Sequence, residues 1–508
     1  MPSYHTSGPS TTTKASGNME TDPPPLRRRY IEFYSGIGGW SLALDLACRA
    51  IERGDTTHPR RMRVEVQRVA SYDHSDLCNA VFAHNFIDVG AGGEGAMGTD
   101  KSVSRREKRK RKRGPPPGGR PPQATSLPSY PIEKLSRKVL ADLNADIWVM
   151  SPPCQPHTRQ HSNHAVEEEL SDPRSRSFLH LLGLLDEMAA EDANGDSGSS
   201  SLPKLILLEN VVGFESSASC ARYMSALRRH GYSAEAFHLT PSHLGLPNDR
   251  PRYYSVAVRS LKASVGGASA EGGGTGPPPL LPAGMHDGGA IRTSIPSPGA
   301  SGLPSSSSHP PTIASYLDAD LPPLALGPDS VDQIKLGTLQ IPKSTIAKSA
   351  SWCFDVITKV AKRSACFTSS YGRFAKGTGS VLYYGGVGAK PRSSGEGKKN
   401  VGSDLRSRDD VTQSFRLIAP SERSFDAKWW ESLVLKDGDE PPLLRYLSGT
   451  EVARLMGFPI GNKSEEACFS FPDWCTQKQQ WRLLGNSINV VVSAEVAKIG
   501  IRACLLEE

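Results

Sequence analysis

The sequence lacks the features of several protein classes. No apolar run reaches the roughly 18 residues that a membrane-spanning helix needs. Residues 1–25 are rich in Ser, Thr and Pro and have no apolar segment of the kind found in a secretory signal. The nine cysteines form no paired CxxC units, which argues against a disulfide framework and against a zinc site. We therefore exclude secreted, membrane-spanning and fibrous proteins and expect a reducing compartment.

The net positive charge of the chain is concentrated in one short segment. The 508 residues carry a formal net charge of +7, but residues 101–113 alone contain nine Lys or Arg and a single acid, Glu107. The rest of the chain is therefore close to neutral, which does not indicate a uniformly basic surface for nucleic acid. The basic run is typical of a nuclear import signal or a nonspecific RNA tether. We expect the protein in the nucleus and the cytoplasm.

Glycine and proline, in contrast, are abundant, with 48 and 40 residues. They concentrate in low-complexity stretches, which cover residues 1–26, about 88–128, 190–203, 260–311 and 385–410. Such stretches cannot bury enough apolar surface to offset the entropy lost on ordering. The remaining residues suffice for one large domain and one smaller domain.

The remaining blocks alternate β-prone runs with helical patterns. The β-prone runs lie at residues 29–34, 63–72, 146–150, 204–208 and 252–258. After the first run, apolar residues from Trp40 to Ile51 recur with the spacing of one helix face. This alternation predicts an α/β fold, a Rossmann-like doubly wound sheet with helices on both faces. In such sheets, ligands bind beyond the carboxyl ends of the strands.

Two features near the start of the chain suggest an adenosine ligand. Glycines 36, 38 and 39 would let the backbone approach a ligand closely, although a tight strand-to-helix turn needs the same residues. The spacing is not GxGxxG and there is no Walker lysine, so a pyrophosphate cradle is not favoured. Asp73, after the second run, suits a ribose diol or, alternatively, the N-cap of the next helix.

A thiol and a carboxyl group follow the third and fourth runs. Cys154 lies in the sequence SPPCQP, whose prolines stiffen the loop. The thiol could face a substrate if positive charge lies nearby, or it could be a small buried apolar group. Glu209 directly follows an apolar run, and partial burial would raise its pKa and let it hold a proton. The alternative for Glu209 is a cap or salt bridge for the next turn.

Cationic and imidazole groups complete the set of candidates. Arg250 and Arg252 lie two residues apart at the start of the fifth run, so alternation places them on one face, able to bind an anion or a developing oxyanion. The alternative is a surface ion pair with Asp249. Histidines at 157, 161 and 164 have no Cys or carboxylate partner at a fixed spacing, so we predict no metal site.

Taken in order, these motifs resemble the cytosine carbon-5 methyltransferase family. The matching segments are EFYSGIGG at 32–39, PPCQ at 152–155, ENV at 209–211, Arg250-x-Arg252 and GNS at 485–487. A second group is similar to the signature of one branch, the transfer-RNA aspartate methyltransferases (DNA methyltransferase homologue 2). Its members are Cys366-Phe367-Thr368, Tyr371-Gly372, GTGS at 377–380, and segments within 172–180 and 444–459.

The resemblance implies a covalent mechanism. Addition of the Cys154 thiolate to carbon-6 of cytosine would make carbon-5 nucleophilic. Glu209 would hydrogen-bond ring nitrogen-3 and the exocyclic amine and supply a proton. Arg252, supported by Arg250, would stabilise the developing charge. The resemblance also implies substrate-side residues, which are Gln155, Asn210, Cys366, Phe367 and Thr368.

The resemblance further implies a cofactor, S-adenosylmethionine. The residues expected to bind it are Tyr34, Gly36, Ile37, Gly38, Gly39, Asp73, Glu133, Ser151, Asn486 and Ser487. Glu133 would precede a helix that begins at Lys134. Asn486 and Ser487 would return from the C-terminal part of the chain to close the pocket.

We expect five parts along the chain. They are a disordered tail at 1–26, a catalytic domain at 27–259, a linker at 260–311, a target-recognition region at 312–444 and a C-terminal return to the catalytic domain at 445–508. The catalytic domain contains the basic insert at about 88–128, and the recognition region contains an insert at about 385–410.

The leading hypothesis is a monomeric enzyme that methylates an anticodon-loop cytosine of tRNA, at position thirty-eight, with tRNA-Asp as first substrate. A DNA cytosine-5 methyltransferase is the alternative. The segment Cys366-Phe367-Thr368 and the short recognition region, with no reader or zinc module attached, favour RNA. A catalytically silent nucleic-acid-binding scaffold is less favoured, because a scaffold needs no thiol and protonatable acid together.

Overall fold

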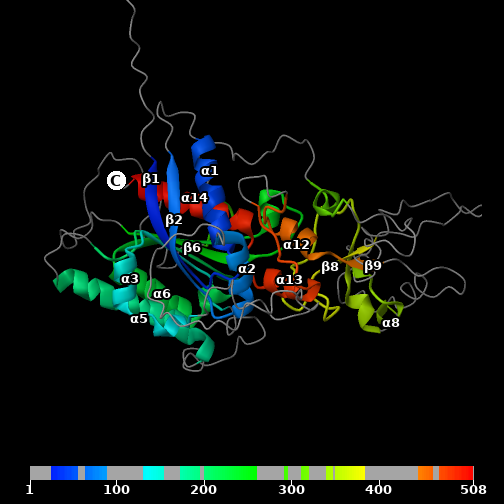
Figure 1. Ribbon diagram of the computed structural model, residues 1–508, viewed down its shortest axis with the longest axis horizontal. Helices are drawn as coiled ribbons and strands as arrows, with labels where there is room; N and C mark the ends of the chain where they lie inside the picture. The colour runs from blue at the N-terminus through cyan, green and yellow to red at the C-terminus, as the bar shows by residue number, and fades with distance from the viewer. Residues whose placement is uncertain are drawn as a thin grey trace, which may run out of the picture.

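The central element of the fold is a six-stranded mixed sheet (Figure 1). The computed structural model describes residues 25–54, 63–87, 130–153, 172–194, 200–259, 291–295, 311–319, 339–346, 349–383, 444–461 and 468–506. The strands are β1 (Leu26–Phe33), β2 (Val64–Tyr72), β3 (Ile147–Met150), β4 (Leu205–Val211), β5 (Tyr232–Leu239) and β6 (Arg252–Arg259). Their order is β2-β1-β3-β4-β6-β5.

The first four strands are parallel, whereas β6 runs antiparallel to both β4 and β5. The chain steps from β1 outward to β2 on one side and from β3 outward to β4 on the other. The carboxyl ends of β1 and β3 therefore flank the point where the strand order reverses, which is where open α/β sheets bind ligands. Because β6 is antiparallel, its first residue, Arg252, lies at this same edge and pairs with Val211.

Helices cover both faces of the sheet, as the sequence predicted (Figure 1). Helices α1 (Gly39–Gly54), α2 (Asp76–Phe86) and α14 (Val490–Leu506) cover one face, and α3 (Arg137–Leu143), α5 (Pro173–Asn194) and α6 (Ala218–Arg229) the other. Alternate residues of each strand enter the two cores. In β1, Tyr30 packs on the side of α1, whereas Ile31 and Phe33 pack on the side of α5. The fold class is thus confirmed.

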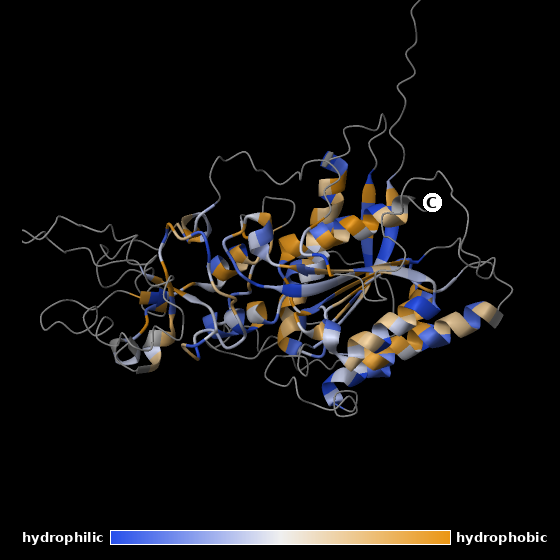
Figure 2. Ribbon diagram, turned by 180° about the vertical axis from the view of Figure 1, so that it is seen from behind, coloured by the Kyte–Doolittle hydropathy of each residue, from blue (hydrophilic) through white to orange (hydrophobic). Residues whose placement is uncertain are grey.

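The core strands are continuous apolar runs because both of their faces are covered. All four residues of β3 and the first six of β4 are buried, and Figure 2 shows the centre of the sheet as largely apolar. On α1 the predicted stripe is buried, with Trp40, Ala43 and Leu44 at 1% exposure or less. In the described part of the chain, no helix is long and apolar enough to cross a membrane.

A second, smaller sheet lies at one end of the molecule (Figure 1). It contains β7 (Asp355–Ile357), β8 (Ser380–Tyr383) and β9 (Leu444–Tyr446), in that order. Helices α12 (Gly449–Leu455) and α13 (Gln477–Gly485) connect it with the main sheet, and α8 (Lys343–Ile346) lies beside it. Short 3-10 turns occur at η2 (Ile132–Lys134), η4 (Phe214–Ser216), η5 (Pro241–Leu244), η7 (Ile313–Tyr316) and η8 (Ser349–Cys353).

Several expected boundaries differ from the structure. Glu209 lies within β4 and not after it, because β4 continues to Val211 by pairing with β6. The helix expected from Lys134 begins at Arg137, where Ser136 supplies the N-cap. The low-complexity stretch expected at 190–203 overlaps α5, which continues to Asn194.

Two interdomain boundaries also differ. Residues 291–295 fall in the expected linker, yet Arg292 pairs with the edge strand β5: its N–H donates to Ala236 O and its carbonyl accepts from His238 N. The expected boundary between 444 and 445 divides β9, which belongs to the small sheet. The basic run at 101–113 lies outside the described residues.

Candidate active site

The glycine turn that follows β1 is shaped by close packing and by a positive φ at three positions, Tyr34, Gly36 and Gly38. A Cβ at Gly38 would lie 2.1 Å from the Phe86 ring, and a Cβ at Gly39 would lie 2.6 Å from Ile488. Both positions therefore require glycine for packing. At Gly36, in contrast, the nearest atom to an added Cβ would be Tyr34 O at 4.0 Å, so the turn is open there.

Asp73 fixes the glycine turn to the end of β2. Its Oδ2 accepts a hydrogen bond from the Gly36 N–H at 2.9 Å, and its Oδ1 accepts from the Ser75 N–H at 2.8 Å. Ser75 is the N-cap of α2, so the alternative of Asp73 as the N-cap is wrong. Each carboxylate oxygen has a second lone pair, which leaves capacity for a hydroxyl donor.

A buried carboxyl group, Glu32, lies beneath the same turn. It accepts hydrogen bonds from the Trp40 N–H at 3.2 Å and from the Ser41 hydroxyl at 2.5 Å, at the start of α1. The Ser41 oxygen in turn accepts from the Tyr30 hydroxyl and from Arg68. Burial raises the pKa of Glu32 to about 7. Sequence reasoning quoted this residue in a motif but assigned it no role.

Glu209 and Arg252 meet at the carboxyl end of β4. Glu209 is 7% exposed, and its Oε1 lies 3.3 Å from Arg252 Nε. Ser151, after β3, also hydrogen-bonds Glu209, and its oxygen accepts from Trp40 Nε1 at 2.9 Å. Burial raises the pKa of Glu209, and the charges of Arg252 and Arg250 only partly offset this effect. The site therefore contains a carboxyl group suited to holding a proton.

Arg250 connects three parts of the chain. Its Nη1 donates to Phe367 O at 2.8 Å and to Cys366 Sγ at 3.4 Å, and its Nη2 donates to the carbonyls of Gly485 and Ser487. The side chain is 3% exposed. From the sequence, Arg250 is expected to support Arg252 in stabilising developing charge. In the structure both of its Nη atoms bond protein carbonyls, which gives Arg250 a positioning role.

The recognition segment brings Cys366 to the two arginines. Burial alone would raise the pKa of the Cys366 thiol, but the charges and hydrogen bonds of Arg250 and Arg252 outweigh it, so that the pKa is lowered. The Phe367 side chain is 1% exposed and packs edge-on against Tyr371. The ring therefore belongs to the core. Thr368 donates its N–H to Thr378 O, which closes the following loop.

Of the remaining substrate-side and cofactor candidates, some lie near the site and others belong to the core. Asn210 is buried and its Nδ2 donates to Pro152 O at 3.4 Å, which ties β4 to the proline loop. Ser487 Oγ would lie 3.4 Å from a Cβ at Gly39, so the C-terminal return adjoins the glycine turn, and Asn486 is the C-cap of α13. Ile37 is 1% exposed and is part of the core.

Two further cofactor candidates lie near each other. The Tyr34 hydroxyl donates to Ser177 Oγ at 3.0 Å, at the start of α5. Glu133 is exposed within η2, and its charge acts on Tyr34. Cys154, Gln155 and the histidines at 157, 161 and 164 lie outside the described residues, which stop at Pro153 on this side of the site.

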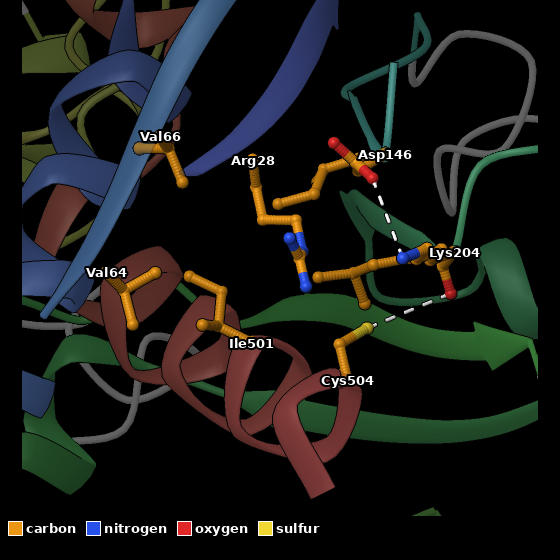
Figure 3. A pocket seen from close by; sticks show the side chains of 9 residues that line it. Arg28, Val64, Val66, Asp146, Lys204, Ile501 and Cys504 are labelled. Carbon is orange, nitrogen blue, oxygen red and sulfur yellow. Dashed lines mark hydrogen bonds and ion pairs between the residues drawn. The ribbon is translucent and has the colours of Figure 1, made fainter. Parts of the chain in front are cut away.

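A cavity of about 10 Å³ lies at the opposite edge of the sheet (Figure 3). Its lining includes Val64 and Leu205, the first residues of β2 and β4, together with Arg28, Asp146 and Cys504. This volume holds about one water molecule. The cavity is therefore too small for a cofactor, and it lies away from the carboxyl ends of the strands.

Comparison with known proteins agrees with this geometry. The family model described as C-5 cytosine-specific DNA methylase matches residues 123–271, which include β3, β4, Glu209 and both arginines. The chain contains a carbon-5 cytosine methyltransferase domain. The match covers the predicted PPCQ and ENV segments, so the family resemblance and the enzyme class inferred from the sequence are confirmed.

The similarity extends along most of the chain. The tRNA (cytosine(38)-C(5))-methyltransferase of Rattus norvegicus is 28% identical over 490 residues, covering 93% of this chain and 98% of the relative. The crystal structure of a DNMT2 mutant from Spodoptera frugiperda superposes with a TM-score of 0.54 at 25% identity, covering 93% and 99% of the two chains. The Dnmt2 methyltransferase of S. pombe shares the fold, with a TM-score of 0.51 at 22% identity and coverage of 94% and 98%.

Proposed function

We propose that this methyltransferase modifies carbon-5 of a cytosine in tRNA, at position thirty-eight of the anticodon loop, with tRNA-Asp as first substrate, and that it acts as a monomer. The observation that supports it best is the buried pair of Glu209 and Arg252, 3.3 Å apart, at the sheet edge where the proline loop begins. A carboxyl group that holds a proton can donate it to a pyrimidine ring, and a fixed guanidinium beside it can stabilise the charge that develops on that ring.

The residues at the glycine turn fit S-adenosylmethionine. The open space beside Gly36 leaves room for a ligand against the backbone, and Asp73 at the end of β2 can accept from ribose hydroxyls. Ser487 and Ile488, which follow α13, adjoin Gly39. When bound, S-adenosylmethionine supplies an electrophilic methyl group. No phosphate-binding lysine is needed, because this cofactor has no phosphate.

The chain's own residues would activate the base. Cys154, the residue after Pro153, adds as a thiolate to carbon-6, which gives carbon-5 the character of an enamine. Glu209 hydrogen-bonds ring nitrogen-3 and the amine and donates a proton as electrons enter the ring. Arg252 stabilises charge on the ring carbonyl oxygen. After carbon-5 receives the methyl group, its proton passes to solvent and the electrons of that C–H bond re-form the 5,6 double bond, which expels the Cys154 sulfur as a thiolate. Ring nitrogen-3 returns its proton to Glu209, and the enzyme is regenerated.

An RNA substrate is supported by the name of the rat relative and by one contact in the structure. The rat relative is named for cytosine-38 of tRNA. In this chain, the segment Cys366-Phe367-Thr368 packs directly on Arg250, next to the Glu209–Arg252 pair. A loop cytosine is also easier to bring into such a site than a paired one, because extrusion from a duplex costs a few kcal/mol of unpairing and unstacking.

The test is methyl transfer from labelled donor to three substrates, namely a tRNA-Asp transcript, the same transcript with the target cytosine changed to uridine, and duplex DNA. We expect labelling of the first substrate alone. Labelling of DNA above that of tRNA would overturn the substrate assignment. The variant Cys154→Ala should bind donor and RNA but transfer no methyl group, and methylation by this variant would overturn the mechanism.

A further inference from the structure

An aromatic side chain stands out on the loop that follows the site. Phe374 is 55% exposed, more than any other large apolar side chain in the described part of the chain. Its loop begins two residues after Cys366, whose sulfur accepts from Arg250 at 3.4 Å. A single exposed apolar side chain is common on protein surfaces, so the exposure of this ring alone identifies no site. Its support and its charged surroundings give it significance.

The base of this loop is fixed by buried contacts. Tyr371 is buried, donates its hydroxyl to Ser380 O and accepts from Leu447 N at 2.9 Å. Gly372 packs so closely on Trp481 that a Cβ would lie 2.4 Å from the indole ring. Thr368 and Thr378 join the two ends of the loop. Phe374 is thus held outward by a rigid support and does not belong to a loosely folded segment.

The surroundings of Phe374 are cationic. The Arg373 guanidinium lies over the phenyl ring at 5.0 Å from its centroid. Between Asp355 and Ser380 the sequence has no acidic residue. The five basic side chains of this stretch, all exposed, are those of Lys359, Lys362, Arg363, Arg373 and Lys376. Arg363 also pairs with Asp249, which ties the stretch to the main domain.

We propose that Phe374 and Arg373 form a stacking platform for an unpaired RNA base next to the target cytosine. This inference rests on the proposed RNA substrate. Unpaired bases in RNA loops are recognised by stacking on aromatic rings and on arginine planes, and the backbone that joins them is attracted by cations. A protein partner would be expected to bury a wider apolar area than one ring among five cations.

The platform would also stabilise the RNA when the target cytosine leaves its stack. Once the target cytosine leaves its stack, its neighbour loses a stacking partner on one side. A ring on a rigid loop beside the site replaces that partner without contacting the target itself. Arg373 covers one face of the Phe374 ring and is attracted to it, as cations are to aromatic rings. This attraction holds the ring in place and leaves its other face for the base.

The first experiment measures single-turnover methylation and binding of the tRNA-Asp transcript by three variants. Phe374→Ala should weaken RNA binding about tenfold, within the range found when a stacking aromatic is removed. It should raise the RNA concentration that gives the half-maximal single-turnover rate more than it lowers the maximal rate. Phe374→Trp should retain wild-type binding. Val360→Ala is the matched control, because Val360 is 52% exposed on the same basic stretch but is not aromatic, and its affinity should stay unchanged.

The second experiment detects stacking directly. A transcript with 2-aminopurine at a loop position flanking the target should lose fluorescence on binding the wild-type protein, and this quenching should be absent with Phe374→Ala. If wild-type protein methylates the transcript and Phe374→Ala matches it in affinity and quenching, the platform is wrong while the proposed function stands. If wild-type protein methylates no RNA, the proposed function itself fails, and the platform fails with it.

Discussion

The Nη1 atom of Arg250 lies 2.8 Å from the carbonyl oxygen of Phe367, across the boundary between the large sheet and the recognition segment. The same side chain also reaches the carbonyls of Gly485 and Ser487. One guanidinium therefore sets the positions of three segments that are far apart in sequence. Its planar set of five N–H donors is the reason that lysine cannot replace it.

Replacing Arg250 with methionine should lower both stability and activity. The change leaves buried carbonyls of Phe367, Gly485 and Ser487 without this donor, and each unsatisfied group costs about 1–3 kcal/mol. We expect a loss of about 3 kcal/mol or more in the free energy of unfolding, measured by urea titration. Arg222→Met, at an exposed position of α6, should change it by about 0.5 kcal/mol or less. Equal effects of the two changes would contradict the positioning role.

The carboxyl group of Glu209 should control the alkaline side of the pH profile. Because burial raises its pKa, the carboxyl keeps its proton above the ordinary range of a glutamate and loses it as pH rises further. The single-turnover rate should therefore fall at high pH. In Glu209→Gln, the rate should drop about 10²- to 10⁴-fold and the alkaline fall should disappear. An unchanged alkaline limb in this variant would assign that limb to another group.

Glu32 should make the protein less stable as pH rises from about 4.5 to about 7. Its pKa is raised from 4.5 to about 7 by burial, so the folded chain binds the proton more tightly than the unfolded chain. Stability is then greatest below this window and declines through it, by on the order of 3 kcal/mol.

The measurement for Glu32 is the thermal midpoint at pH 5, 6 and 7. Glu32→Gln should flatten the profile over this window, because the amide does not ionise. The same exchange at the exposed Glu187 of α5 is the control and should leave the wild-type profile intact. A wild-type midpoint that rises from pH 5 to pH 7, with a slope removed by Glu32→Gln, would reverse the assigned direction.

Two Gly→Ala changes should have opposite effects. A Cβ at Gly485 would lie 2.1 Å from backbone atoms of Thr368 and Ser369, which cannot move without displacing the recognition segment. Gly183, within α5, has no atom within 4 Å of its Cβ position. Gly183→Ala should raise stability by about 0.5–1 kcal/mol through helix propensity. Gly485→Ala should lower both the melting temperature and methyl transfer. Similar shifts for the two variants would argue against the close packing at Gly485.

Much of the main sheet could be predicted from local sequence signals. The runs at 29–34, 63–72, 146–150, 204–208 and 252–258 all became strands. In β3 and β4 the signal is a continuous apolar run, because both faces of these strands are covered. In the edge strand β2 the signal is instead the alternation of apolar and polar residues at its start. The edge strand β5 was not predicted. Its sequence contains Glu235 and His238, and it is held by pairing with β6, the next strand along the chain, and with Arg292, which is far from it in sequence.

The sequence predicted those parts of the candidate site in which the residue type itself indicates the chemistry. The carboxyl of Glu209 and the guanidinium of Arg252 do lie together. The sequence could not separate the roles of Arg250 and Arg252, since alternation treats them alike, and only tertiary contacts direct Arg250 to backbone carbonyls. The burial of the Phe367 ring was not predictable either, because a motif does not say which of its side chains faces inward.

The packing of Ile488 and α14 against Gly39 and α1 has a consequence for synthesis. During translation, the first helix emerges several hundred residues before its neighbour at the other end of the chain. Until Ile488 leaves the ribosome, the apolar side of α1 is therefore either exposed to solvent or covered by a chaperone. A nascent chain on a ribosome stalled before Ile488 emerges should not bind the methyl donor, because the residues that adjoin the glycine turn are still missing.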